Sequence, residues 1–130
     1  MMRYFVRLAL AILCAPLVAC SVSEEKEIRI GRDEARQINE QLPLVRDSVI
    51  NEYVQSLGKR LAAKTSRANL EWHFSVVDSP EINAFAIPGG YVWVNRGLIE
   101  RTERMDQLAG TLGHEIGHIV RRHSVRQVQS

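Results

Sequence analysis

Hydrophobic positions change their spacing along the chain, and this change divides it into predicted helices and strands. Residues 31–42 are rich in Arg, Glu and Gln, with apolar residues three and four apart, which predicts a surface helix ended by Pro43. Asp47 is the predicted N-cap of a second helix. One stripe of that helix carries the apolar side chains of Val49, Tyr53, Val54, Leu57 and Leu61. Each helix therefore has one face to bury.

From Leu70 the apolar residues alternate with their neighbours, which predicts a half-buried strand over residues 70–77. His73 belongs to the face opposite Trp72, where we expect an exposed strand residue and not a metal ligand. Residues 83–87 and 91–94 are two short apolar runs joined by Pro-Gly-Gly, which predicts a hairpin. A helical turn or two is expected over residues 98–103, and a final helix begins near Met105.

The first nineteen residues form a separate segment. A basic stretch over residues 1–7 is followed by an apolar run over residues 8–19, broken at Pro16. About twelve apolar residues are too few to span a hydrocarbon core, which needs about 20 in a helix, so the segment is a predicted secretory signal peptide. Its end, Leu-Val-Ala-Cys, resembles a bacterial lipobox, which implies cleavage before Cys20 and lipidation of that residue. The alternative is a plain signal peptide with a chance cysteine.

Length, charge and cysteine content narrow the class of protein. A chain of 130 residues allows one domain, with residues 20–30 as a lipidated tether and residues 31–130 as the folded part. The sequence has 17 basic and 15 acidic residues, and both surplus cations lie in the predicted signal segment, which argues against a nucleic-acid partner. The envelope is the expected compartment. In the Gram-negative sorting pattern that this sequence resembles, a residue other than Asp after the cysteine favours the outer membrane. Ser21 occupies this position.

Residues 114–118 read His-Glu-Ile-Gly-His, an HExxH pattern that carries the candidate chemistry. In a helix His118 lies about 40° round from His114 and about 6 Å further along, so both imidazoles can face one metal ion. Zinc held by neutral imidazoles lowers the pKa of its water to about 7. Glu115 can reach that water without ligating the ion, so it is the predicted general base and acid.

The other sides of the same helix predict how it packs. The side opposite the histidines carries the apolar residues Leu108, Leu112, Ile116 and Ile119. A third strip carries Gly110, Gly113 and Gly117. Each glycine costs about 1 kcal/mol relative to alanine in a helix interior, so we expect another element to approach this strip closely. The alternative interpretation of the histidine side is an ordinary polar surface.

Three segments, residues 83–94, 97–99 and 108–123, strongly resemble the CAAX prenyl protease and HtpX-like zinc metallopeptidases, and within them the soluble branch with BepA, LoiP and the Oma-type enzymes. The resemblance implies an α+β, gluzincin-type domain, with helices packed on a small mixed or antiparallel sheet. It implies one Zn²⁺ per chain, bound by His114 and His118, with Glu115 catalytic.

The same resemblance implies where a polypeptide substrate binds. Asn83, Ala84 and Phe85, or the strand that follows Asn83, would line the cleft and pair with an extended substrate as an added strand. The alternative for Phe85 is packing within the sheet core. The expected partners are therefore an extended or misfolded polypeptide and, through Cys20, a membrane.

The sequence departs from the family at the third zinc ligand. The family takes this ligand from a glutamate on a later helix, whereas residues 116–130 contain no Asp or Glu. His123 lies about 140° round the helix from His118, so we expect a helix-end cation there instead. Two hypotheses follow. The sequence is the amino-terminal part of an envelope metalloendopeptidase acting on unfolded or misassembled proteins, or it is an inactive lipoprotein that binds extended polypeptide or metal weakly.

Overall fold

A computed structural model describes residues 22–122, and within them four helices and three strands. In chain order they are α1 (Glu24–Gln41), α2 (Ser48–Ala62), β1 (His73–Val77), β2 (Ala84–Ile87), β3 (Tyr91–Asn95), α3 (Arg96–Arg101) and α4 (Met105–Val120). The predicted signal peptide, Cys20 and His123 lie outside the described residues. None of the helices over residues 22–122 has the length and apolar character needed to cross a membrane.

The strands form one mixed sheet in the order β1-β3-β2. β1 runs parallel to β3, and β2 runs antiparallel to it. The predicted hairpin is confirmed, because Ile87 pairs with Tyr91 across the Pro-Gly-Gly turn. Both turn glycines, Gly89 and Gly90, have positive φ angles, 99° and 105°, which L side chains adopt rarely. The α+β class and the mixed sheet agree with the sequence prediction.

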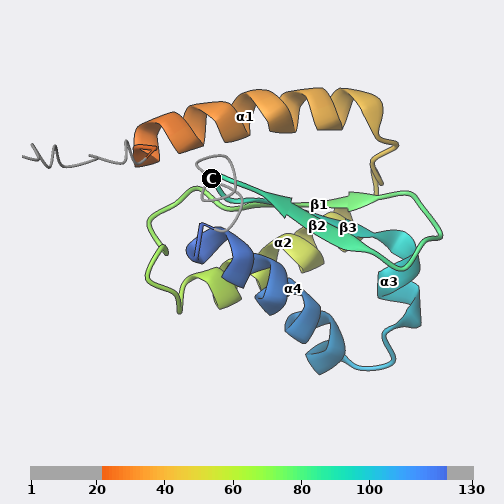
Figure 1. The fold of residues 1–130 in the computed structure, drawn as a ribbon. Helices are drawn as coiled ribbons and strands as arrows, with labels where there is room; N and C mark the ends of the chain where they lie inside the picture. The colour runs from red at the N-terminus through yellow and green to blue at the C-terminus, as the bar shows by residue number, and fades with distance from the viewer. Residues whose placement is uncertain (1–21, 123–130) are drawn as a thin grey trace, which may run out of the picture.

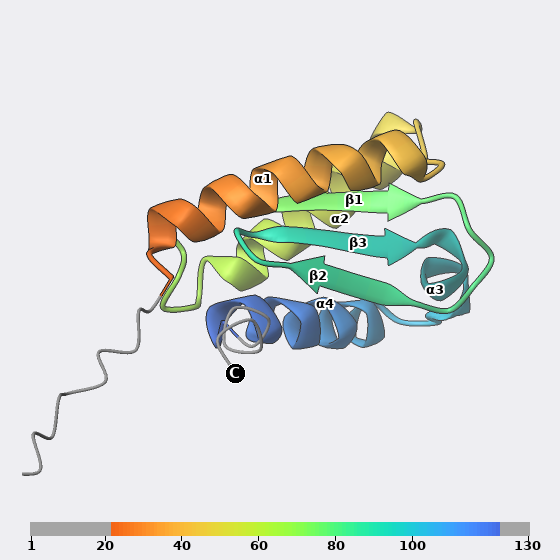
Figure 2. The same cartoon turned by 45° about the horizontal axis from the view of Figure 1, so that its top comes forward.

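The helices cover the two faces of this sheet (Figure 1). α1 lies across one face, α2 and α4 lie on the other, and α3 lies beside one end of the strands. Turning the molecule shows that β2 is the strand that runs alongside α4 (Figure 2). The order β1-β3-β2 places β2 at one edge of the sheet, next to the helix that carries the HExxH pattern.

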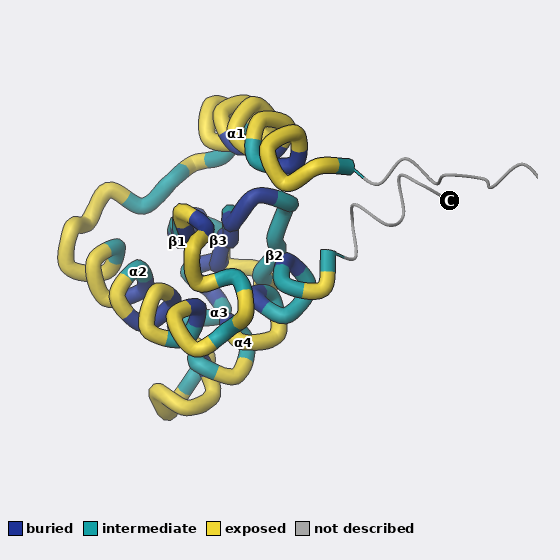
Figure 3. Tube along the Cα trace, turned by 90° about the vertical axis from the view of Figure 1, so that its left-hand side faces the viewer, coloured by how far each residue is buried: buried dark blue, intermediate teal, exposed yellow. Residues whose placement is uncertain are grey.

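The first helix begins at Glu24 and not at Gly31, so residues 24–30 are not the tether that the sequence predicted. Ser23 caps the helix by accepting a hydrogen bond from the backbone N–H of Lys26 at 3.2 Å. The helix ends at Gln41, before Pro43, as expected. The polar stretch resembles a tether because most of its side chains are exposed, as the outer side of α1 shows (Figure 3). Glu27 is the exception and is buried.

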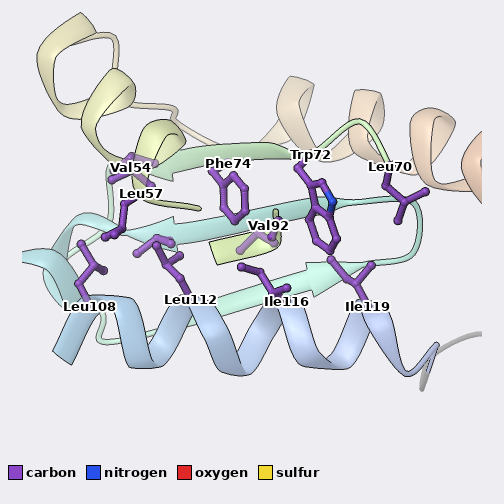
Figure 4. Close-up of a cluster of buried hydrophobic side chains, with 13 residues drawn as sticks. Val54, Leu57, Leu70, Trp72, Phe74, Val92, Leu108, Leu112, Ile116 and Ile119 are labelled. Atoms are coloured by element: carbon purple, nitrogen blue, oxygen red, sulfur yellow. The ribbon is translucent and has the colours of Figure 1, made fainter. Parts of the chain in front are cut away.

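The main core lies between the sheet and the pair α2 and α4 (Figure 4). Asp47 caps α2 as predicted, with its carboxylate 2.9 Å from the N–H of Val49. Val54 and Leu57 of the predicted stripe are buried. Val49 is 74% exposed and Tyr53 is 39% exposed, so the prediction of a buried stripe is wrong for the first turns of α2. The core needs only the middle and end of α2, because its first turns lie beyond the packed face.

Candidate metal centre

α4 is held by the side that the sequence predicted. Leu108, Leu112, Ile116 and Ile119 are all buried and point toward the sheet (Figure 4). The histidines lie away from this side, with His114 exposed and His118 half-buried. The helix therefore buries one side in the core and leaves the other side accessible to a ligand.

The two imidazoles converge. Their Nε2 atoms are 3.0 Å apart, and the ring planes meet at 87° with centroids 4.6 Å apart. Two nitrogen ligands at 2.0–2.1 Å from one zinc ion in tetrahedral geometry lie about 3.3 Å from each other. The nitrogen pair thus needs to open by only a few tenths of an ångström to hold one ion. The two imidazoles therefore fit two of the ligand positions around a zinc ion.

Glu115 lies one residue after His114 and is half-buried at the margin of the exposed side. Glu115 lies between the two histidines in sequence and outside the buried apolar stripe, so its side chain starts from a part of α4 that is not packed against the core. Over residues 22–122, no cluster of three or more His, Cys, Asp or Glu side chains is suited to a metal ion. The upstream carboxylates of Glu81, Glu100 and Glu103 therefore do not complete the pair.

The predicted glycine strip on α4 does not serve close packing within the described residues. A Cβ atom built on Gly110 or Gly113 meets nothing within 4 Å, and on Gly117 it meets only the side chain of Arg121. The expectation of a close neighbour is wrong for this part of the chain. Close packing against a glycine is found elsewhere, for example at Gly31 of α1, where a Cβ would lie 2.0 Å from the carbonyl oxygen of Pro88.

The residues predicted to bind substrate lie at the start of β2 and have different environments. Phe85 stacks on Trp93, with ring centroids 5.0 Å apart, on the sheet face that α1 covers. Asn83 turns its side chain back to accept a hydrogen bond from the N–H of Ala84 at 3.0 Å. Ala84 and Ala86 pack on the opposite face, against the core that includes α4. The strand is thus near the histidines, while the aromatic ring of Phe85 is not directed toward them.

Backbone pairing shows which atoms of β2 remain at the sheet edge. The N–H of Asn95 donates to the carbonyl of Asn83, so Asn83, Phe85 and Ile87 turn their backbone groups toward β3. Ala84 and Ala86, the residues between them, direct theirs outward. Ala86 also lines a small cavity of about 10 Å³ together with His118. The edge strand therefore shares a cavity with His118 of α4 at Ala86, a residue that sequence reasoning did not single out.

Sequence reasoning also missed a buried ion network at the end of α4. Glu27 is 1% exposed and receives two contacts from the guanidinium of Arg67, at 2.8 and 3.2 Å. Nε of Arg122 lies 2.7 Å from the second carboxylate oxygen, an ion pair without hydrogen-bond alignment. The three residues are separated by 40 and 55 positions in the chain, so no local pattern could reveal them. A single buried position in a polar helix gives no distinct sequence signal.

A helix that buries its apolar side and presents two converging imidazoles, with a glutamate between them in the sequence, has the HExxH pattern that is typical of metallopeptidases. The chain belongs to peptidase family M48, whose family model matches residues 48–130. The resemblance noted in the sequence is thereby confirmed.

Individual relatives agree with this assignment. The chain is 34% identical over 109 residues to the beta-barrel assembly-enhancing protease of Yersinia pestis, an alignment that covers 84% of this chain and 22% of the relative. It is 32% identical over 112 residues to the mitochondrial metalloendopeptidase OMA1 of Schizosaccharomyces pombe, covering 82% of this chain and 33% of the relative. The chain thus spans between about a fifth and a third of the length of these relatives.

Proposed function

We propose that this chain carries the metal-binding helix of a zinc-dependent endopeptidase of the bacterial envelope, with a gluzincin-type site, that cleaves extended segments of unfolded or misassembled proteins. The observation that carries the proposal is the convergence of the two Nε2 atoms to 3.0 Å on the accessible side of α4. The family, and relatives that include a beta-barrel assembly-enhancing protease and OMA1, support an endopeptidase of this kind.

Each residue of the pattern has a distinct role in the proposal. His114 and His118 hold the ion through their Nε2 atoms, with the apolar side of α4 fixing the helix beneath them. When bound, zinc polarises the substrate carbonyl and lowers the pKa of its water to about 7. The carboxylate of Glu115 would act as general base and acid: it would take a proton from the attacking water and return one to the leaving amine.

Catalytic zinc requires three protein ligands and an open position, and residues 22–122 supply two. We infer that the third ligand comes from outside these residues. The relatives are three or more times longer than the matched segment, so activity is proposed for a chain that contains this ligand. Without it, the two imidazoles bind metal weakly, which is the outcome expected of an inactive, metal- or polypeptide-binding lipoprotein.

An extended substrate would add to the edge of the sheet at β2. The outward backbone groups there are the carbonyls of Ala84 and Ala86 and the N–H of Ala86, because the N–H of Ala84 is already bonded to the side chain of Asn83. Backbone pairing of this kind recognises an extended chain and not a particular sequence. It brings the substrate backbone beside α4, and it agrees with an enzyme that acts on unfolded segments.

The proposed lipid anchor would place this site close to a membrane. Nη2 of Arg122, just after α4, donates a hydrogen bond of 2.6 Å to the carbonyl of Val22. Cys20 precedes Val22 by two residues, a span of at most about 7 Å. Lipidation of Cys20 would therefore hold the end of α4 near the surface of the outer membrane, and His118 precedes Arg122 by about one helical turn.

The test compares the chain as given with a version extended by the codons that follow residue 130 in its gene. We expect the extended protein to bind one zinc per chain and to hydrolyse casein, and Glu115→Gln to reduce that hydrolysis at least about 100-fold while retaining the metal. Glu81→Gln removes an exposed carboxylate from a loop and should leave activity unchanged. Hydrolysis that survives Glu115→Gln would refute the assignment. Zinc-free, inactive protein in both versions would support the non-catalytic alternative.

A further inference from the structure

The buried carboxylate of Glu27 is not used by the proposed chemistry, yet it lies beside the metal-site helix. We propose that Glu27 is a positioning residue, which fixes the last turn of α4 through Arg67 and Arg122 and thereby sets the position of the His118 imidazole. The inference rests on the proposed function, because it assumes that His114 and His118 bind a metal ion.

The contacts of Arg67 carry the first step. Its Nη1 donates both to Glu27 at 2.8 Å and to the backbone carbonyl of Ile119 at 3.2 Å. Ile119 directly follows His118, and its carbonyl is one of the last of α4, which have no partner within the helix. Arg67 is itself restrained, since its own carbonyl accepts a hydrogen bond of 3.0 Å from the indole of Trp72. Glu27 thus orients a cation that caps the helix at the residue after the metal ligand.

The contacts of Arg122 carry the second step. Arg122 has a φ of 55°, a left-handed conformation that is uncommon for a residue other than glycine. Its backbone N–H donates to the carbonyl of Ile119 at 3.0 Å, which closes the final turn. Its guanidinium spans from Glu27, at 2.7 Å, to the carbonyl of Val22, at 2.6 Å. The ion pair therefore holds a strained residue in the conformation that ends the helix.

The space around the Glu27 carboxylate is small and is shared with His118. Glu27, His118 and Arg122 line the same cavity of about 10 Å³, the room of one water molecule. Pro88 of the β2–β3 turn also lines this cavity, and its carbonyl oxygen lies against Gly31, one turn of α1 after Glu27. A change at Glu27 thus has little free space in which to be absorbed. It is transmitted to the turn of α4 that holds His118.

A contribution to stability alone is a poor explanation for the burial of the Glu27 carboxylate. Burying charged groups costs desolvation energy, and a buried ion pair repays it only with good geometry. Here one carboxylate meets two guanidinium groups, whose side chains are 12% and 31% exposed, and the pair joins the first helix to the last. An ion network of this kind specifies a geometry between distant segments. The segment so specified contains a candidate metal ligand.

The test measures binding of Ni²⁺ to the purified chain by titration calorimetry, at a temperature where circular dichroism shows every variant fully folded. We expect Glu27→Gln to raise the Kd about tenfold, in the range known for residues that orient metal ligands. Glu27→Asp keeps the charge and should recover part of the loss. The matched control is Glu25→Gln, which removes an exposed carboxylate from the same turn of α1 and should leave the Kd within about twofold.

Two further variants keep the outcomes separate. If Glu27→Gln does not fold, Arg122→Gln tests the proposal instead. This variant removes the link to the end of α4 and leaves the ion pair of Glu27 with Arg67 in place. We expect it also to raise the Kd for Ni²⁺ several-fold. A Kd that is unchanged in these variants overturns the positioning role. His114→Ala tests the proposed function itself: if Ni²⁺ binding persists in that variant, the metal does not bind at the histidine pair.

Discussion

Two glycines, both inside helices, are expected to respond to the same substitution with opposite signs. Gly31 of α1 is buried against the β2–β3 turn, whereas Gly110 of α4 has no neighbour within 4 Å of a built Cβ. Alanine is about 1 kcal/mol better than glycine in a helix interior. Gly110→Ala should therefore stabilise the protein by about 0.5–1 kcal/mol, because nothing described in the structure opposes the added methyl group.

At Gly31 packing decides whether alanine stabilises or destabilises the protein. The added Cβ would lie 2.0 Å from the carbonyl oxygen of Pro88 and 3.0 Å from its carbon, and both atoms are backbone. Relief requires α1 or the turn to move by about 1 Å, and overpacking of this kind costs about 1–3 kcal/mol or more. After the gain in helix propensity, we expect Gly31→Ala to lower the free energy of unfolding by about 1–2 kcal/mol.

Urea unfolding followed by circular dichroism measures both changes, and thermal unfolding should show shifts of about 4–8 °C per kcal/mol for a domain of this size. The free energies of unfolding of the two variants should differ by about 2–3 kcal/mol. Equal or greater stability of Gly31→Ala would refute the packing of α1 on the turn. Loss of stability in Gly110→Ala would show that a segment outside the described residues packs on the glycine strip.

Three other expectations concern the anchor, the metal and the core. Cys20→Ser should abolish incorporation of radiolabelled palmitate and release the protein from the membrane fraction; retention of both would contradict the lipobox interpretation. The chain as given should bind zinc with a Kd above about 1 μM, because it is one ligand short, and tighter binding at one equivalent by equilibrium dialysis would show otherwise. Leu112→Ala, at a position with 0% exposure, should cost about 3 kcal/mol in urea unfolding, against less than about 0.5 kcal/mol for Val49→Ala at 74% exposure.

The features that could be predicted from the sequence depend on local periodicity. The hairpin follows from a Pro-Gly-Gly turn between two apolar runs, and the buried side of α4 follows from four apolar residues at helical spacing. The convergence of His114 and His118 is likewise a consequence of helix geometry, and the structure bears it out with the Nε2 atoms 3.0 Å apart. Each of these features is contained in one continuous segment.

The features that could not be predicted depend on contacts between distant segments. Gly31 and Pro88 are 57 positions apart in the chain, so the reason for the glycine is not visible near it. For the glycine strip on α4 the sequence predicts a close neighbour that the described residues do not supply. A row of glycines has the same sequence pattern whether or not another element approaches it. The sequence predicts too late a start for α1, because the residues buried in its first turns, Glu27 and Gly31, are not apolar side chains.

The weak apolar pattern of α1 also makes it difficult to predict from the sequence where the folded domain begins. Similarity to the family model starts at residue 48, after α1, although α1 covers one face of the sheet (Figure 1). Asn39 of α1 accepts a hydrogen bond of 2.9 Å from the indole of Trp93, which is 1% exposed. Without α1 that indole would lose its cover, and Arg67 and Arg122 would lose the carboxylate between them. The helix that holds the histidine pair therefore depends on residues that the family model does not match, and α1 belongs to the domain on physical grounds.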